Sequence, residues 1–174
     1  MLLRYQSQTP HIRALLDEVD LENESIWPAL VLRHLESDLL SSSNKRTLTR
    51  KELKLVSRGV LESLHVLHKD GFIHTGNLQS FHPIFTSILT TLDIKPSNIL
   101  VNYDFPDGHI TEVQIADLEG VRHQDSEYAK CSGLIGTAIF RSTEAFLELP
   151  WGTPTDVWSF GATVRISYGG KTRI

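Results

Sequence analysis

Two stretches of the chain carry side chains that suit phosphate and metal chemistry. The first is Asp93-Ile94-Lys95-Pro96-Ser97-Asn98, and the second is Ile115-Ala116-Asp117. Together they supply two carboxylates, an amide and a cation. Phosphoryl transfer needs such a set, because metal ions, a phosphate group and a hydroxyl nucleophile must be held together. A polar turn without a chemical role is the simpler alternative for either stretch taken alone.

The first stretch resembles the catalytic loop of eukaryotic protein kinases, whose pattern is His-x-Asp-x-Lys-Pro-x-x-Asn. The resemblance implies that Asp93 accepts the proton of the substrate hydroxyl, Lys95 contacts a phosphate and Asn98 binds a metal ion. It also implies that Asp117 is the magnesium-binding aspartate of the family's Asp-Phe-Gly motif. Glu119 stands where that motif has glycine, so we expect a loop of altered mobility.

Two further motifs follow in the order that the kinase family has. Residues 136–144 resemble the end of the activation segment, which implies that Thr137 hydrogen-bonds the catalytic aspartate and lysine. Residues 156–161 match the family's Asp-x-Trp-Ser-x-Gly, which implies that Asp156 ties the catalytic-loop backbone to the next helix. The resemblance predicts an α+β, protein kinase-like fold of the serine/threonine type. Its large lobe would be mainly helical, beside a remnant of the β-rich small lobe.

An apolar stretch upstream, Ala29-Leu30-Val31-Leu32, has the composition of a buried strand. The segment after it resembles the kinase hinge, where extended backbone meets adenine, although a surface turn after a strand is the alternative. The resemblance implies a nucleotide pocket in which Leu32 is the gatekeeper and backbone groups of Arg33 and Leu35 face adenine. It places Asp38 near the ribose and makes Leu100 the floor of the pocket.

The elements that must position these residues are also indicated by the sequence. Thr49 and Glu52 have the spacing of a capping box, and apolar residues then recur every three or four positions. This predicts a helix of about 20 residues that Gly71 ends as a left-handed cap. The members of the apolar stripe are Leu53, Val56, Val60, Leu64 and Leu67.

Shorter elements flank that helix. Ile99-Leu100-Val101 and the stretch Ile110 to Ile115 are strand candidates, joined by a hairpin turn within Tyr103 to Gly108. Polar composition predicts a loop from Ser41 to Arg46, and Asp17 to Glu24 reads as an acidic turn.

Residues 76–92 interrupt the catalytic-loop pattern. They separate His74-Thr75 from Asp93, contain no charged residue, and show neither helical periodicity nor strand alternation. Joining Thr75 to Asp93 restores the family pattern. Our hypothesis is that these residues are a translated, retained intron. The alternative is a genuine loop insertion, which would be established if every mature transcript contained the corresponding nucleotides.

Metal and redox chemistry by histidine and cysteine is not indicated. Cys131 is the only cysteine in the sequence, so no internal disulfide forms. His65 and His68 lie one helical turn apart, but no cysteine or carboxylate completes a metal site with them and His74.

Composition bounds the remaining function classes. The 174 residues are 40% hydrophobic and 22% charged, enough for one domain core but fewer than a full kinase domain. The net charge of −4 gives no reason to expect nucleic acid or a membrane surface as a partner. No signal peptide and no apolar run of about 18 residues is present, so we expect an intracellular protein, cytoplasmic or nuclear.

The resemblance divides the chain into residues 1–35, a remnant of the small lobe, and residues 36–174, a partial large lobe. The small-lobe remnant would hold the end of its helix, its last two strands and the start of the hinge, without the phosphate loop or strand lysine. The implied function is a protein serine/threonine kinase domain that uses ATP and Mg²⁺ to phosphorylate serine or threonine of a protein substrate. The alternatives are a catalytically inactive, kinase-like binding module and an incomplete gene-model fragment.

Activation-loop phosphorylation is predicted not to control activity. Thr75 replaces the arginine that precedes the catalytic aspartate in the family and pairs there with a phosphorylated residue. Replacing Ser126, Tyr128 and Ser132 by residues without a hydroxyl should leave the rate of phosphoryl transfer unchanged, measured in a version that lacks residues 76–92 and carries a complete small lobe. A large drop in rate contradicts this prediction.

Overall fold

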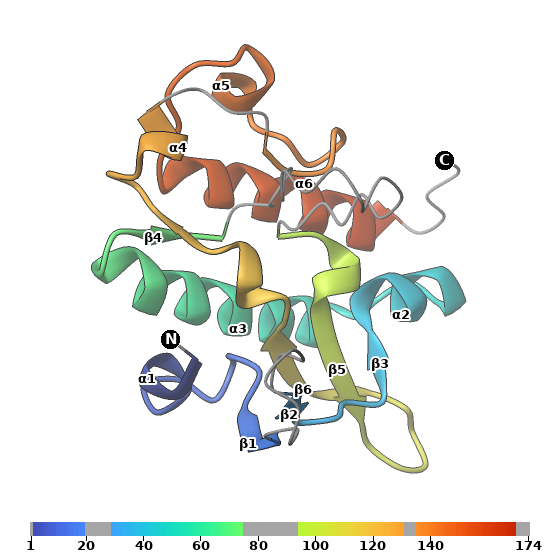
Figure 1. Ribbon diagram of the computed structural model, residues 1–174. Helices are drawn as coiled ribbons and strands as arrows, with labels where there is room; N and C mark the ends of the chain where they lie inside the picture. The colour runs from blue at the N-terminus through green and yellow to red at the C-terminus, as the bar shows by residue number, and fades with distance from the viewer. Residues whose placement is uncertain (1, 20–28, 75–93, 131–134, 170–174) are drawn as a thin grey trace, which may run out of the picture.

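The computed structural model describes residues 2–19, 29–74, 94–130 and 135–169 (Figure 1). Asp93, Thr75, the predicted insertion at residues 76–92, and Cys131 and Ser132 lie outside the described residues. The first part of the chain forms α1 (Leu2–Gln6), β1 (Leu15–Val19), β2 (Ala29–Leu32), β3 (Ser37–Asp38), α2 (Leu39–Lys45), α3 (Arg50–Lys69) and β4 (Phe72–Ile73).

The second part of the chain alternates short strands with helices. It forms the 3₁₀ turn η1 (Pro96–Asn98), β5 (Ile99–Tyr103), β6 (Ile110–Ile115), the 3₁₀ turn η2 (Leu118–Gly120), β7 (Arg122–His123), α4 (Glu127–Lys130), α5 (Thr143–Phe146) and α6 (Pro154–Gly169). The described residues therefore form an α+β fold, in which small antiparallel sheets pack with helices.

Helix α3 is the central element of the core, and its predicted ends are confirmed. The Thr49 hydroxyl accepts a hydrogen bond from the Glu52 N–H, and the Glu52 carboxylate accepts one from the Thr49 N–H. Gly71 follows the helix with φ +72°, the left-handed conformation that glycine adopts without strain. Val56, Val60, Leu64 and Leu67 of the predicted stripe are buried, and Leu53 packs against them.

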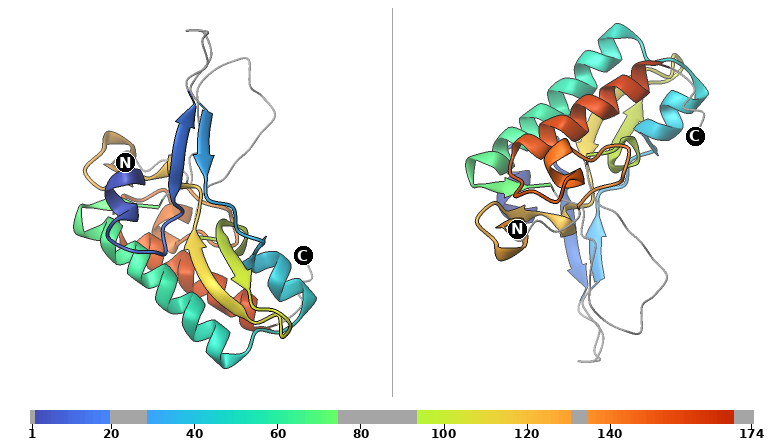
Figure 2. Two further views of the ribbon diagram at one scale, coloured as in Figure 1. Left: turned by 90° about the horizontal axis from the view of Figure 1, so that it is seen from below. Right: turned by 90° about the horizontal axis from the view of Figure 1, so that it is seen from above.

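The predicted hairpin is also confirmed and packs on α3. Strands β5 and β6 pair antiparallel with Ile99 opposite Ile115, and β3 adds a third strand beside β5. Val101, Val113 and Ile115 are buried between this sheet and α3. Figures 1 and 2 show α6 running along the other side of α3. The hairpin and α6 are thus held in place by one long helix.

Strand β2 has the predicted bounds, but the expectation that it is buried is wrong. Leu30 is 45% exposed and Val31 is 41% exposed. The reason is that, within the described residues, β2 pairs with β1 in a two-stranded ribbon that projects from the body of the molecule (Figure 2). Asp17 and Glu18, which we expected in a turn, lie in β1.

The loop expected from Ser41 to Arg46 is instead most of helix α2. Asp38 caps this helix, because its carboxylate accepts hydrogen bonds from the Ser41 N–H at 2.8 Å and the Ser41 hydroxyl at 2.7 Å. The hydroxyls of Ser42 and Ser43 donate to backbone carbonyls within the same turn. The serines that suggested a loop therefore satisfy their hydrogen bonds inside a short helix, which the buried Leu39 anchors.

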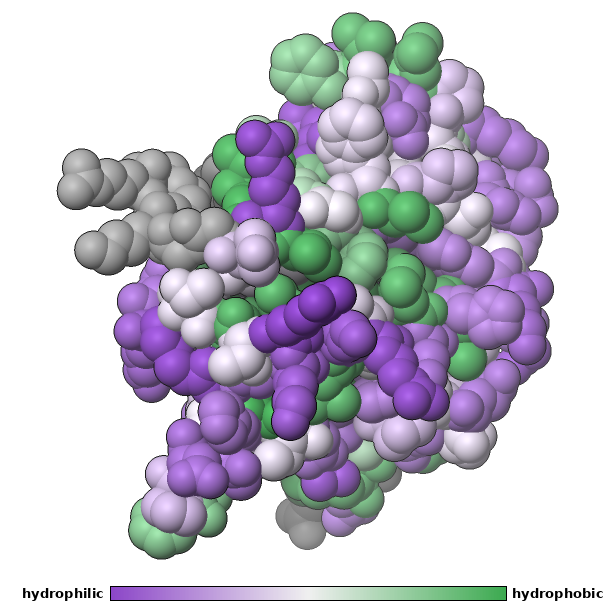
Figure 3. All heavy atoms as spheres, turned by 180° about the vertical axis from the view of Figure 1, so that it is seen from behind, coloured by the Kyte–Doolittle hydropathy of each residue, from purple (hydrophilic) through white to green (hydrophobic). Residues whose placement is uncertain are grey.

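Apolar side chains are exposed over α5 and on α6. Figure 3 shows apolar atoms gathered at the top of the molecule, where α5 lies. The most exposed of them is Phe146, at 66%. Leu147, Leu149, Val157 and Trp158 are also exposed. Among the helices that the structure describes, none is long and apolar enough to cross a membrane.

The ion pair between Glu52 and Arg46 is predicted to stabilise this fold. Glu52 is buried and also accepts hydrogen bonds from the Thr49 N–H and the Ile110 N–H. The Arg46 guanidinium hydrogen-bonds the carboxylate and lowers its pKa, despite the opposing effect of burial. Glu52→Gln should lower the free energy of unfolding by about 2–3 kcal/mol in denaturant titrations at pH 7.

The pH dependence follows from the lowered pKa. The contribution of Glu52 is present above the pKa of an unfolded glutamate, about 4.3, and is lost as the pH falls below that value. Glu62→Gln is the control, since Glu62 makes a solvent-exposed pair with Arg58 on the same helix and its loss should destabilise the protein far less than Glu52→Gln. Equal losses in the two variants contradict the prediction.

Candidate functional site

The β5–β6 hairpin brings together the two chemically promising stretches of the sequence. Asn98 ends η1 just before β5, and Asp117 follows β6. The Ala116 N–H donates a hydrogen bond to the Asn98 carbonyl at 2.8 Å, and Ala116 immediately precedes Asp117. This hydrogen bond therefore holds the backbone at Asn98 close to Asp117. Asp117 itself has φ +63°, a left-handed conformation that is uncommon outside glycine and occurs often at functional sites.

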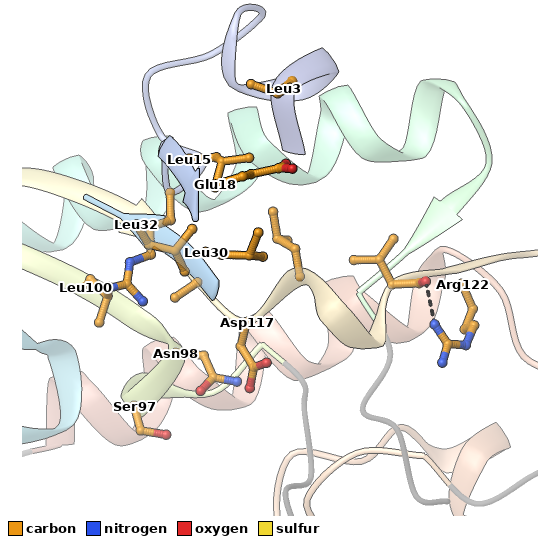
Figure 4. Close-up of a pocket in the computed structure, with 14 residues that line it drawn as sticks. Leu3, Leu15, Glu18, Leu30, Leu32, Ser97, Asn98, Leu100, Asp117 and Arg122 are labelled. Carbon is orange, nitrogen blue, oxygen red and sulfur yellow. Dashed lines mark hydrogen bonds between the residues drawn. The ribbon is translucent and has the colours of Figure 1, made fainter. Parts of the chain in front are cut away.

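Asn98 and Asp117 line a cavity of about 690 Å³ between the hairpin and the β1–β2 ribbon. Figure 4 shows their side chains beside each other, with Leu32 and Leu100 on the neighbouring wall. The volume is within the range of small-molecule sites. The ribbon contributes three leucines and the charged Glu18, and the hairpin contributes Leu100 beside the polar Asn98. Its other described lining residues are Leu3, Arg13, Leu15, Glu18, Leu30, Ser97, Ala116, Leu118, Val121 and Arg122.

The donor atoms at the polar end fit magnesium. Mg²⁺ prefers oxygen ligands, and one or two protein side chains plus the phosphates of a substrate usually complete its shell. The Asn98 amide oxygen and the Asp117 carboxylate supply such ligands on one wall of the cavity. In the part of the chain that the structure describes, no group of three or more histidine, cysteine or acidic side chains gathers as a metal cluster. The metal would thus depend on a bound phosphate for further oxygens.

The predicted hinge residues lie outside the described lining of this cavity, apart from Leu32. The Arg33 carbonyl, predicted to face adenine, accepts a hydrogen bond from Nε of Arg13 at 2.9 Å. Leu35 is buried. The carboxylate of Asp38, predicted near the ribose, caps α2.

Lys95 and Thr137 are also absent from the described lining of the cavity. The carbonyl of Lys95, immediately before η1, accepts a hydrogen bond from the Asn98 N–H at 2.9 Å. The carbonyl of Thr137 accepts hydrogen bonds from the N–H groups of Phe140 and Arg141. Thr137 is predicted to hydrogen-bond Asp93, which lies outside the described residues, and Lys95 is predicted to contact a phosphate; both roles stay predictions.

Asp156 ties the backbone before the catalytic loop to α6, as the sequence motif implied. Its Oδ2 accepts hydrogen bonds from the His74 N–H and from Nε2 of His68, both at 2.8 Å. Asp156 and His74 are each 1% exposed. Nε2 of His74 lies 3.1 Å from the Ala116 carbonyl, so His74 connects Asp156, through its backbone N–H, to the residue before Asp117, through its ring. His68, which we weighed as a metal ligand, instead supports this network.

Helix α6 holds further segments of the site by buried polar groups. The Ser159 hydroxyl donates to the Phe140 carbonyl at 2.9 Å. The Thr155 hydroxyl donates to the Glu144 carboxylate at 2.9 Å. The end of the predicted activation segment therefore lies against α6 through specific hydrogen bonds.

Sequence reasoning missed the charged residues that line the cavity and the polar face of α6. Arg13, Glu18 and Arg122 line the cavity but belong to no motif in the sequence. The signal that could have identified the polar face is the helical spacing of Asp156 with the hydroxyl residues that follow it.

Comparison with curated proteins finds serine/threonine protein kinases. Serine/threonine-protein kinase 4 homolog A of Dictyostelium discoideum is 30% identical over 162 residues, which cover 91% of this chain and 29% of that protein. Serine/threonine-protein kinase pakE of the same organism is 27% identical over 118 residues, 68% of this chain and 10% of that protein. Serine/threonine-protein kinase PAK 4 of Homo sapiens is 26% identical over 145 residues, 83% of this chain and 20% of that protein.

The chain thus spans less than a third of the length of each of these relatives. No protein-family model matches it.

Removal of residues 76–92 is predicted to preserve the fold. The nearest described residues on either side, His74 and Ile94, are both hydrogen-bonded to α6. His74 bonds Asp156, and Ile94 bonds the Thr163 hydroxyl. Residues seven positions apart in a helix are about 10 Å apart along its axis, and three extended peptide units reach about 10 Å. Joining Thr75 to Asp93 should therefore keep both anchors and raise the melting temperature, because a shorter loop costs less entropy to close.

Thermal unfolding monitored by circular dichroism measures this effect. A version with a glycine- and serine-rich segment of equal length in place of residues 76–92 is the control, and it should melt near the temperature of the original chain. Failure of the shortened chain to fold, with the control folded, contradicts the prediction.

Proposed function

Because the chain belongs to the serine/threonine protein kinase family, we propose that it is part of a kinase domain that transfers the γ-phosphoryl group of ATP to a serine or threonine hydroxyl of a protein. The observation that carries this proposal is the pairing of Asn98 and Asp117 on one wall of a cavity large enough for a small molecule. An amide and a carboxylate in contact with the same space suit a metal–phosphate ligand better than an apolar one.

The residues of the chain divide the work of transfer between the two ends of this cavity. Leu32 and Leu100 would offer apolar surface to the adenine ring, and Asn98 with Asp117 would hold Mg²⁺. The metal, when bound, neutralises charge that develops on the transferring phosphoryl group. Asp93 accepts the proton of the attacking hydroxyl, and Lys95 contacts a phosphate; both roles rest on the sequence motif.

Positioning is the main contribution of the protein to this reaction. Phosphoryl transfer requires little covalent chemistry from the enzyme, so its rate depends on the alignment of nucleophile, phosphate and metal. The network from Asp156 through His74 to Ala116 is suited to this purpose, since Asp156 and His74 are buried and are joined through the N–H and Nε2 of His74. It ends one residue from Asp117.

A kinase-like binding module without catalytic activity is the second candidate function. It is favoured by the Arg33 carbonyl, whose hydrogen bond from Arg13 competes with adenine for the hinge. The insertion between Thr75 and Asp93 also favours it, because an aspartate that is not fixed near its working position loses effective molarity. Such a module would bind a nucleotide or a protein but would not transfer phosphate.

Radiolabelled ATP with Mg²⁺ and a protein substrate distinguishes the two candidates. The chain itself would be compared with a version that lacks residues 76–92 and carries a complete small lobe. We expect transfer by the second protein, and a loss of about 10²-fold or more on Asp93→Asn, because that change removes the proton acceptor. Asp117→Asn should reduce the rate by a similar factor through the metal.

Glu62→Gln serves as the control, because Glu62 pairs with Arg58 on the exposed face of α3 and should leave the rate unchanged. Transfer that survives both Asp93→Asn and Asp117→Asn contradicts the proposed site. Nucleotide binding without transfer in every version supports the inactive binding module.

A further inference from the structure

One hydroxyl on α6 reaches the start of the catalytic segment directly. Thr163 is 0% exposed, and its Oγ1 donates a hydrogen bond to the Ile94 carbonyl at 2.7 Å. A threonine inside a helix commonly bonds the carbonyl four residues earlier in its own helix. Thr163 instead bonds a residue 69 positions away in sequence.

Ile94 needs this donor because it is buried. It is 1% exposed, and a buried backbone carbonyl without a partner is costly. Ile94 is also the residue that immediately follows Asp93. The hydrogen bond therefore fixes the main chain at the first described position after the predicted proton acceptor.

The same short segment is fixed again at its other end. The Asn98 N–H donates to the Lys95 carbonyl at 2.9 Å, which closes the η1 turn. The Asn98 carbonyl accepts from the Ala116 N–H at 2.8 Å. The segment of residues 94–98 is thus hydrogen-bonded to α6 at Ile94. At Asn98 it is hydrogen-bonded to Ala116, the residue before Asp117.

Thr163 belongs to a row of buried polar side chains on α6. Asp156 lies two helical turns earlier and bonds the His74 N–H on the other flank of the interrupted loop, and Ser159 bonds the Phe140 carbonyl. Ser167 lies one turn later and is also buried, but its hydroxyl has no hydrogen-bond partner among the described residues. The same row of α6 therefore contains the hydrogen-bonded hydroxyl of Thr163 and a buried hydroxyl, that of Ser167, which can serve as its control.

We propose that Thr163 is a positioning residue for phosphoryl transfer, which holds the backbone between Asp93 and Asn98 through its hydrogen bond to Ile94. This inference rests on the proposed kinase function. Thr163 acts through the main chain, and it does not itself line the cavity in the described structure. Its loss frees the start of the segment that carries Asn98, and a displacement near 1 Å of a catalytic group lowers the transfer rate by about 10²-fold.

Three substitutions in the full chain test this role. Thr163→Val keeps the shape of the side chain and removes the donor, and Thr163→Ser keeps the donor. Ser167→Ala removes a buried hydroxyl from the same helix without breaking a described hydrogen bond. Hydrogen exchange of the amides of residues 94–101, read by mass spectrometry, reports whether the segment is held. The turnover number and KM of phosphoryl transfer report whether its position matters for chemistry.

We expect Thr163→Val to raise the exchange rate of this segment about tenfold or more, and Thr163→Ser and Ser167→Ala to leave it unchanged. The exchange of α3 amides should stay the same in all variants. Where transfer is measurable, Thr163→Val should lower the turnover number much more than it changes KM for ATP. Thr163→Ser should restore the turnover number.

Two results overturn the proposal. One is an exchange pattern in which Thr163→Val and Ser167→Ala behave alike, and the other is faster exchange across the whole of α3 and α6, which marks general destabilisation. Exchange is measured without nucleotide, so it does not depend on catalysis. If the exchange result is as expected and no variant transfers phosphate, even in the version that lacks residues 76–92 and carries a complete small lobe, the proposed function fails while the anchoring of residues 94–98 by Thr163 stands.

Discussion

A single buried carboxylate oxygen joins the parts of this protein on which the site depends. Oδ2 of Asp156 accepts hydrogen bonds from the His74 N–H and from the His68 ring, so one atom connects α6, α3 and the start of the catalytic loop. A buried charge is tolerated only when hydrogen bonds compensate for lost water, and here two donors do so. The carboxylate therefore fixes the positions of His68 and His74, because moving either residue away from Asp156 would leave a buried polar group without a hydrogen-bond partner.

The site is assembled outward from this oxygen. The His74 ring carries the constraint to the Ala116 carbonyl, and the Ala116 N–H carries it to the Asn98 carbonyl. Asn98 and Asp117 then meet on one cavity wall, although 18 residues of hairpin separate them in the sequence. Asn98 is thus hydrogen-bonded into the buried part of the molecule, whereas the opposite side of the cavity is built partly from a two-stranded ribbon that carries exposed leucines and Glu18. Such a division places the groups for metal and phosphate on the firmer half of the molecule.

Local sequence rules predicted the elements whose stabilising interactions are local. The capping box predicted the start of α3, Gly71 predicted its end, and two apolar stretches joined by a turn predicted the β5–β6 hairpin. The same rules failed for α2, where serine hydroxyls bond their own backbone, and for β2, whose exposure depends on which strands surround it. The buried face of α6 is polar, with Asp156, Ser159 and Thr163 bonded to three distant segments, and hydrophobic periodicity cannot reveal such a face. The motifs singled out Asn98, Asp117 and Asp156, but no motif singled out Arg13 or Thr163.

We propose that Asn98 and Asp117 together hold the metal of a bound nucleotide. The most direct measurement is the broadening of backbone amide signals by Mn²⁺ in nuclear magnetic resonance spectra of the chain with ADP, since paramagnetic relaxation marks the residues nearest the ion. The account predicts that the amides of residues 98 and 117 broaden first, only when nucleotide is present, while the amide of Glu62 on the exposed face of α3 keeps its intensity. Broadening centred on other residues, or the same broadening without ADP, would contradict it.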